Sequence, residues 1–283
     1  EGNYSIRNMC RWAIVSRSGY YEWRDRPVSA TQRWRDELGD IIEVLFADSD
    51  GTYGYRRIHA DLQRAGRPCD PQTVRVLMAE RGLVACQPRP RGPRTTIPAA
   101  SGALPDLVNR DFTADEPGLK LVGDITYIPT WQGWVYLATV LDCCTKKVVG
   151  YAMAEHMRTE LVVDALKMAI INGHTRHGET IFHSDRGTQY MSAEFAEFTR
   201  DAGIVRSVGR TGICYDNAWA ESFNATLKVE RVHRTVYPTR RHAIGDIARY
   251  IELRYNQRRL HSALQYRTPN EAEQDWYETN KAA

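Results

Sequence analysis

The sequence has 283 residues, 42% of them hydrophobic, and a formal net charge of +3. The length predicts two domains, or one domain with arms, and the apolar fraction allows a sizeable core. No apolar run reaches the roughly 20 residues that span a bilayer, no signal peptide opens the chain, and the six cysteines form no CxxC pair. Composition therefore argues against a membrane protein and a disulfide-stapled domain, and it predicts a cytoplasmic location.

Charge is distributed unevenly along the chain. Residues 1–100 hold 16 Arg and no Lys against 12 acidic residues, residues 101–221 hold 11 basic against 16 acidic residues, and residues 222–283 hold 11 basic against 7 acidic residues. An acidic centre between two basic flanks fits a metal-binding core between surfaces for a polyanion. Ordinary solvated helices give sums of this size too, so charge alone does not decide for nucleic acid.

Residues 1–48 are predicted to form an N-terminal helical arm. Two short helices fit residues 4–23, with Ser16 as the N-cap of the second, a weak helix–turn–helix signal. A longer amphipathic helix is predicted over residues 31–48. Its apolar positions, spaced by three and four, are Trp34, Leu38, Ile41, Ile42, Leu45 and Phe46.

Residues 49–86 are predicted to form a helix–turn–helix DNA-binding region. A glycine-rich entry precedes a short helix that carries Arg56 and Arg57. In the next helix Asp70 is the expected cap and proline follows at the first helical position. This second helix would enter a major groove, although a plain helical hairpin packed on the core fits the same pattern. The side chains expected to face DNA are Gln72, Thr73 and Arg75.

Residues 87–117 are predicted to be a linker, because their proline density is incompatible with helices and with sheet interiors. The linker is basic. Arg89, Arg91 and Arg94 are expected to lie along a phosphate backbone.

Residues 118–232 show the pattern of an α/β core. Three strands separated by short gaps predict an antiparallel meander, and strands and helices then alternate in the order βαβα after a first helix. This order predicts a mixed sheet with helices on both faces. The predicted strands cover 119–129, 133–142, 147–153, the run ending at Asp185, and 204–208, and the predicted helices cover 160–171, 192–202 and the segment from Asp216 through Lys228.

Residues 233–283 are predicted to be a helical C-terminal tail. One helix is expected over residues 239–257. A terminal helix is expected to begin after Thr268, because Thr-Pro-Asn-Glu is typical of a capped N-terminus.

Three acidic residues of the core carry the predicted chemistry. Asp124 stands within an apolar strand, Asp185 follows a buried strand, and Glu221 lies on a helix thirty-five intervening residues after Asp185. A buried carboxylate without a partner is costly, so this set favours a cation. Hard oxygen ligands suit two magnesium ions, with manganese as the alternative, in a phosphoryl-transfer site. Asp142 also ends a strand and is interpreted as a turn carboxylate.

Two further residues share a predicted helix face with Glu221. Asn217 precedes it by four residues and Lys228 follows it by seven. Asp216 is expected to favour the start of this helix through the helix dipole. Asn217 is expected to orient a ligand, and Lys228 is expected to hold a DNA phosphate near the metals.

These motifs closely resemble the DDE motif of insertion-sequence transposases of the "IS-three" type, a branch of the transposase and retroviral-integrase superfamily. The resemblance rests on Gly-Asp124-Ile-Thr-Tyr-Ile, His-Ser-Asp185-Arg-Gly-Thr-Gln-Tyr and Tyr-Asp-Asn-Ala-Trp-Ala-Glu221-Ser-Phe-Asn-Ala-Thr-Leu-Lys228. It extends to Tyr53-Gly-Tyr-Arg-Arg-Ile-His and to Tyr255-Asn-Gln-Arg-Arg-Leu-His. It implies an RNase H-like core with a mixed five-stranded sheet, two magnesium ions, and DNA strand cleavage and joining at element ends.

The resemblance also implies partners. In that family a first-frame product or fusion portion supplies a further helix–turn–helix and a coiled-coil zipper. This sequence has no leucine heptads before residue 31 and opens with Glu1, so it resembles the second-frame portion. The expected partners are double-stranded DNA at terminal inverted repeats and target, the first-frame portion, and further copies of the chain assembled on DNA. The expected location is the bacterial cytoplasm, in association with the nucleoid.

Two other functions and one other metal remain as alternatives. A regulatory DNA-binding protein with a decayed core would not need the intact acidic triad. An RNase H-type nuclease acting on RNA–DNA hybrids would not need the basic arms. His174 and His177 are a weak zinc signal against ordinary loop histidines.

Overall fold

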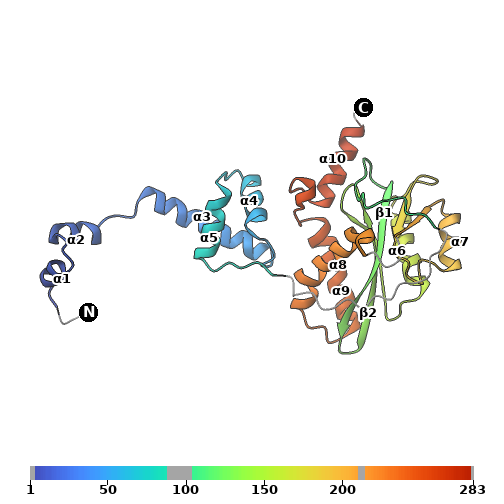
Figure 1. The fold of residues 1–283 in the computed structure, drawn as a ribbon, viewed down its shortest axis with the longest axis horizontal. Coiled ribbons are helices and arrows are strands. Elements are labelled where there is room, and N and C mark those ends of the chain that lie inside the picture. Colours follow the sequence, from blue (N-terminus) through green and yellow to red (C-terminus); the bar gives the residue numbers. More distant parts are fainter. Residues whose placement is uncertain (1–3, 88–103, 210–213, 282–283) are drawn as a thin grey trace. The chain divides into compact units, whose positions relative to one another are not determined.

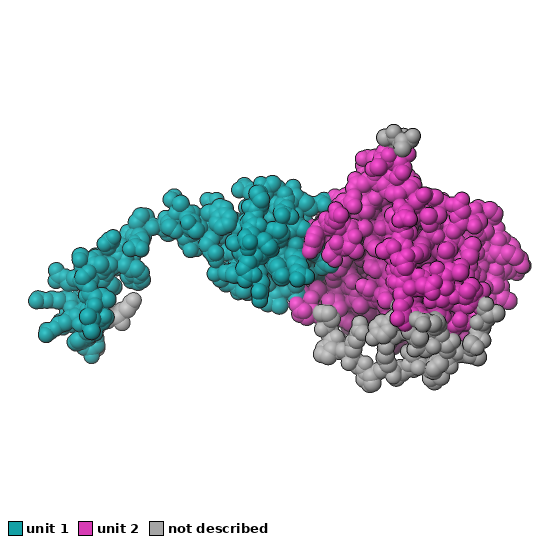
Figure 2. Space-filling model, turned by 45° about the horizontal axis from the view of Figure 1, so that its top comes forward, with its two compact units in different colours: residues 1–85 teal, residues 86–283 magenta. Residues whose placement is uncertain are grey.

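A computed structural model of the chain describes residues 4–87, 104–209 and 214–281. The chain divides into two compact units, residues 1–85 and residues 86–283 (Figure 2). The linker arginines Arg89, Arg91 and Arg94 lie outside the described residues. The finer division at residues 48, 86, 117 and 232 stays a prediction.

The first unit is entirely helical among its described residues, as expected from its periodicity. Ser16 caps the second helix, accepting a hydrogen bond from the Gly19 amide at 2.9 Å, and Asp70 caps the fifth, accepting from the Gln72 amide at 2.7 Å. Both predicted caps are therefore confirmed. The helices are α1 (Ile6–Trp12), α2 (Arg17–Arg24), α3 (Ala30–Asp48), α4 (Tyr55–Arg64) and α5 (Pro71–Glu80).

Helices α3, α4 and α5 pack together around a small apolar core. Trp34 was expected on the buried stripe of α3, but its side chain is 46% exposed. The stripe is buried only farther along the helix, where α5 and α4 cover it. The core side chains of these three helices are Leu38, Ile42, Ile58, Leu62, Val74, Leu77 and Met78.

The second unit is built on one five-stranded sheet in the order β3-β2-β1-β4-β5. The first three strands form the predicted antiparallel meander, and β4 and β5 join it in parallel register. The predicted mixed sheet with flanking helices is confirmed. The strands are β1 (Lys120–Thr130), β2 (Gly133–Asp142), β3 (Val148–Ala154), β4 (Ile181–Ser184) and β5 (Val205–Val208).

Helices cover both faces of this sheet (Figure 1). On one face Phe223 and Leu227 of α8 (Ala218–Glu230) and Ile247 of α9 (Arg240–Arg249) pack against the strands. On the other face α6 (Thr159–Ile171) and α7 (Ala193–Asp201) close a second core. The sheet therefore lies between two apolar cores, one on each face.

The C-terminal tail is anchored to α8 by a buried ion pair. The Arg259 guanidinium donates to both carboxylate oxygens of Glu230, at distances from 2.8 to 3.0 Å. The predicted helix over 239–257 is α9 followed by a π-helical stretch, Tyr250–Asn256. The last helix, α10 (Pro269–Lys281), begins with the expected reciprocal cap between Thr268 and Glu271.

The segment before β1 was expected to continue the linker, yet its described part, residues 104–117, is fixed to the second unit. Val108 is buried, the Leu107 amide donates to Ser207 at 2.9 Å, and the Val208 amide donates to the Pro105 carbonyl at 3.1 Å. These contacts hold the segment beside β5.

The two histidines that could signal zinc have separate partners among the described residues. His174 lies 3.3 Å from Glu273, and His177 lies 3.2 Å from the Ala202 carbonyl, so the two histidines have different partners. None of the described helices combines the length and apolar character needed to traverse a bilayer. Cysteines form no disulfide among the described residues, and the free thiols are Cys10, Cys69, Cys86, Cys143 and Cys144.

Candidate active site

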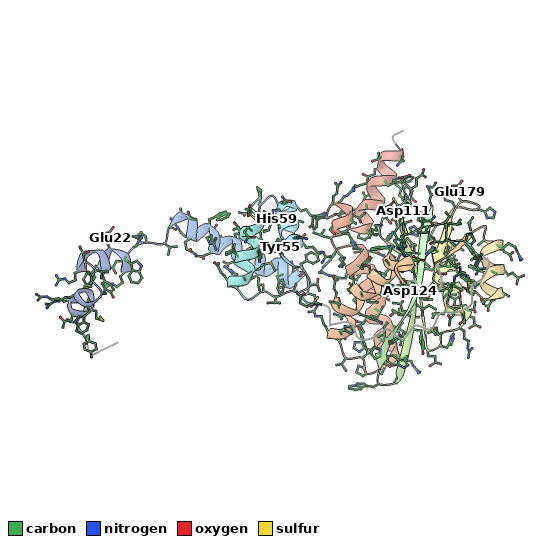
Figure 3. All side chains as sticks on the ribbon, viewed as in Figure 1. Glu22, Tyr55, His59, Asp111, Asp124 and Glu179 are labelled. Carbon is green, nitrogen blue, oxygen red and sulfur yellow. The ribbon has the colours of Figure 1, made fainter. Side chains whose placement is uncertain are left out.

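Asp124 lies on β1, and its side chain points toward α8 (Figure 3). Its Oδ1 accepts a hydrogen bond from the Ile125 amide at 2.9 Å, and its Oδ2 accepts one from Asn224 Nδ2 of α8 at 2.8 Å. The preceding residue must be small, because a Cβ on Gly123 would lie 2.3 Å from the Phe182 ring. Asp124 lies two residues beyond Val122, the last residue of β1 that pairs with β4.

The charges that act on Asp124 include both of the other predicted acids. Burial raises the pKa of the Asp124 carboxyl to about 7, and the negative charges of Asp185 and Glu221 add to this rise. Hydrogen bonds from Ile125 and Asn224 oppose the shift without cancelling it. Charges act in this way only over short distances. Strand, turn and helix thus bring Asp124, Asp185 and Glu221 into one electrostatic cluster.

Asp185 follows β4 at the carboxyl end of the strand. Its carboxylate is exposed, and its Oδ1 accepts a hydrogen bond from the Gly187 amide at 2.9 Å. This short turn directs the side chain away from the sheet interior, toward the edge where parallel strands place ligand sites.

Glu221 lies in the first turn of α8, and two asparagines fasten this part of the helix to β1. Asn217 Nδ2 donates to the Gly123 carbonyl at 3.0 Å, and Asn224 holds the neighbouring Asp124. Within the described residues, no group of three His, Cys, Asp or Glu side chains is close enough to hold a metal ion. Asp124, Asp185 and Glu221 therefore form no closed coordination geometry, and their role as metal ligands stays a prediction.

Lys228 lies nearly two helical turns beyond Glu221. Its Nζ is 4.6 Å from the centre of the Tyr127 ring, a cation–π contact. Burial lowers the pKa of the Lys228 ammonium, and the charge of Asp124 opposes this shift. Lys228 is therefore close to the acidic cluster, as its sequence position suggested.

Helix α8 begins where the sequence predicted a helix N-terminus, with Asn217 as its N-cap after a 3-10 turn, Cys214–Asn217. The buried Asp216 carboxylate accepts a hydrogen bond from Arg110 Nε at 2.8 Å. The Asn217 side chain is buried against β1, and its role in orienting a ligand stays a prediction. Both residues bond to segments about a hundred positions away, which local periodicity does not show.

Asn224 is a site residue that the sequence analysis passed over. It stands three residues after Glu221 and four before Lys228, so helical spacing alone places it on the same face. Tyr190 is a second one: burial raises the pKa of its hydroxyl, and the charges of Asp124 and Asp185 contribute. His183 is structural, because its ring bonds Ser207 and the Asp216 carbonyl, both at 2.8 Å.

The predicted DNA contacts of the first unit lie on α4 and α5. Gln72 and Arg75 are exposed at the start of α5, and Thr73 is partly exposed. On α4 the Arg56 guanidinium is exposed and lies 5.7 Å from the Tyr55 ring, and Arg57 lies 5.5 Å from the Tyr53 ring. Their contact with DNA stays a prediction.

Family models match both units. Two models described as Integrase core domain match residues 114–214 and residues 202–269. A model described as HTH-like domain matches residues 33–91, which include α4 and α5.

Curated relatives align with nearly the whole chain. Transposase InsF for insertion sequence IS3A of Escherichia coli (strain K12) is 35% identical over 264 residues, which cover 93% of this chain and 91% of that protein. The chain belongs to the IS3 transposase family. The transposase for insertion sequence element IS629 of Shigella sonnei is 34% identical, with 97% and 93% of the two chains covered.

Solved integrase structures also align with this IS3-family chain. The HTLV-2 integrase catalytic core domain in complex with magnesium covers 56% of this chain and 97% of its own length, at 18% identity and a TM-score of 0.43. The catalytic core domain of BIV integrase covers 58% and 99%, at 15% identity and a TM-score of 0.42.

Proposed function

We propose that this chain is the catalytic subunit of a DNA transposase that cleaves and joins DNA strands at the ends of an insertion sequence. The observation that supports this most strongly is the electrostatic cluster of Asp124, Asp185 and Glu221, in which the pKa of Asp124 is raised to about 7. Several carboxylates that raise one another's pKa in this way are typical of a site that binds a cation. Membership of the IS3 transposase family supports the same conclusion.

Asp124, Asp185 and Glu221 are the residues proposed to hold two magnesium ions, with manganese as the alternative. The donor set fits, because all three side chains offer hard carboxylate oxygens and their charges raise the cost of ionising Asp124. When bound, the divalent ions would supply an activated nucleophile and neutralise charge on the phosphate under attack.

The chain's own residues position this chemistry. Asp124 must release its proton, and the Asn224 amide, which donates to Oδ2, favours the ionised form. The Lys228 ammonium is proposed to hold a phosphate of the DNA beside the acids. Water then attacks a phosphodiester at the element end, and the freed 3′-hydroxyl attacks a second phosphodiester in the same site.

DNA is proposed to bind along the first unit and the linker. Arg56, Arg57 and the start of α5 would bind one duplex, with Gln72, Thr73 and Arg75 facing the major groove. The linker arginines, at positions 89, 91 and 94, would follow the phosphate backbone. A first-frame portion with a zipper and further copies of the chain would complete the assembly on DNA, in the bacterial cytoplasm. The five-segment division of the chain belongs to this proposal.

A strand-transfer assay tests the proposal. The full chain, with and without a first-frame partner, is incubated with DNA carrying the element's terminal repeats, in magnesium or in chelator. We expect cleaved and joined products only with magnesium, and none with Asp185→Asn, which should still bind the DNA. Joining by Asp185→Asn would refute the site. Preferential cleavage of an RNA–DNA hybrid would identify a nuclease, and binding without cleavage under every condition would identify a regulatory protein.

A further inference from the structure

The β1–β2 hairpin extends beyond the rest of the sheet and carries exposed aromatic side chains. Strand β4 pairs with β1 only at residues 120–122, whereas β1 and β2 remain paired as far as Thr130 and Gly133. On this extension Tyr127 is 53% exposed, Trp134 47% and Trp131 77%. Large exposed aromatic groups at one place mark binding surfaces.

Two of these rings form an ordered pair. The Tyr127 and Trp134 rings lie 4.9 Å apart in an edge-to-face arrangement. Lys228 Nζ is 4.6 Å from the Tyr127 ring, and Lys228 stands one turn after Asn224, which bonds Asp124, so Lys228 links the pair to the acidic cluster. Tyr127 follows Asp124 by three residues on β1, an odd spacing that places the two side chains on opposite faces of the strand.

The hairpin tip is held in place by the start of α9. The Trp131 amide donates to the Tyr237 carbonyl at 3.1 Å, and the Arg240 amide donates to Gln132 Oε1 at 3.0 Å. Arg240 Nε also donates to the Trp134 carbonyl at 3.3 Å. A surface fixed in this way loses little conformational entropy when a ligand binds.

The chemistry of this surface fits an unpaired nucleotide. Its neutral aromatic faces suit a nucleobase, and the ammonium of Lys228 suits the phosphate attached to it. Arg240 adds little charge, because its guanidinium bonds Glu155 at 2.6 Å. A DNA duplex hides the faces of its bases, so only an unpaired or frayed end can stack here.

We propose that Tyr127, Trp131 and Trp134 form a stacking platform that holds an unpaired nucleotide of the DNA end beside the catalytic acids. This inference rests on the proposed function, because it assumes that the acids act on DNA. Stacking tolerates any base, so the platform would capture the frayed end whatever its sequence.

Fluorescence of 2-aminopurine tests the platform without chemistry. The probe is placed at the first unpaired position of a duplex with a short single-stranded tail, and the full chain is titrated in chelator. We expect quenching on binding and an affinity for the tailed duplex about tenfold above that for a blunt duplex. The double variant Tyr127→Leu with Trp134→Leu should lose the quenching and the preference while binding the blunt duplex normally. The matched control is Tyr277→Leu, an exposed ring on α10 (41%) that should change neither.

The outcomes separate this inference from the proposed function. Quenching by wild type and by Asp185→Asn, with no strand transfer by wild type, would support the platform and refute the catalytic role. Normal strand transfer without quenching, or an unchanged preference in the double variant, would overturn the platform alone. If the double variant misfolds by circular dichroism, Trp131→Leu at the exposed tip replaces it and should reduce the preference. If the double variant sediments at a lower mass than wild type and its quenching is unchanged, the patch is a self-association surface and the inference is overturned.

Discussion

Two carboxylates on neighbouring strands of the same sheet have opposite surroundings. Asp142, at the end of β2, is 1% exposed and accepts hydrogen bonds from the amides of Gly118, Cys144 and Thr145 and from the Thr145 hydroxyl. Asp124, on β1, accepts two hydrogen bonds from the described part of the chain. Burial raises the pKa of both, but hydrogen bonds oppose the shift most in Asp142, whereas the charge of Asp185 reinforces it in Asp124.

The difference separates a structural acid from a site acid. Backbone donors satisfy the Asp142 carboxylate, so its role in the turn fully explains why an acid is buried there. Asp124 has fewer donors than its oxygens can accept and faces two like charges, an arrangement that a cation would relieve. Variants of the two acids should therefore differ in activity, in stability and in pH dependence.

Activity should distinguish the two acids most strongly. Asp124→Asn is expected to lower strand transfer by about a thousandfold or more, because each metal ligand supports several kcal/mol of charge stabilisation. Asp142→Asn should retain most activity in its folded fraction. The measurement is strand transfer at equal amounts of DNA-bound protein. A comparable loss in folded Asp142→Asn would break the comparison.

Stability should respond in the opposite sense. Asp142→Ala leaves the amides of Gly118, Cys144 and Thr145 without an acceptor, so unfolding should become easier by about 3 kcal/mol or more. Asp124→Asn removes like-charge repulsion and, in chelator at pH 8, should stabilise the second unit by about 1 kcal/mol. Denaturant unfolding followed by tryptophan fluorescence measures both. Destabilisation by Asp124→Asn would show that its negative charge supports the fold.

The dependence of stability on pH should identify Asp124 directly. Its folded pKa, about 7, exceeds the usual aspartate value of 3.8, so between these pH values the folded state binds more protons than the unfolded state. Stability should therefore fall as pH rises from about 4 to about 7, by on the order of 4 kcal/mol relative to Asp124→Asn. The comparison is made in chelator by denaturant unfolding at each pH. Parallel curves for the two proteins would contradict the raised pKa.

The smallest effect is expected at Asn224. Replacing it by Ser removes the donor to Asp124 Oδ2, one of the hydrogen bonds that lower the carboxyl pKa. The pH of half-maximal strand transfer should rise by about one unit, with activity restored at higher pH. Asn217→Ser is the matched control, because its amide donates to a backbone carbonyl and should leave the pH profile in place. An unchanged profile in Asn224→Ser would assign Asn224 a packing role alone.

Much of this site could be predicted before the fold was known. Alternating and helical periodicity placed Asp124 on a strand, Asp185 after a strand and Glu221 on a helix, and the structure has them there. Local caps at Ser16, Asp70 and Thr268 were predictable for the same reason. These features depend on residues a few positions apart, which the sequence displays directly.

Partners far apart in the sequence could not be predicted. Asp216 pairs with Arg110, Asn224 with Asp124, and Arg259 with Glu230, and each pair joins segments that become neighbours only in the folded chain. The same holds for residues 104–117, whose composition indicates a linker although their contacts with β5 fix them.

The sequence by itself determined which side chains carry chemistry and on which kind of element each stands. Side-chain period and capping are local properties of the backbone. Folding alone brings the charges of Asp185 and Glu221 within range of Asp124 and gives Asp142 its backbone donors. The physical reason is that the ionisation of a carboxyl depends on its burial, its donors and the charges near it, and all three are set by segments that packing brings together.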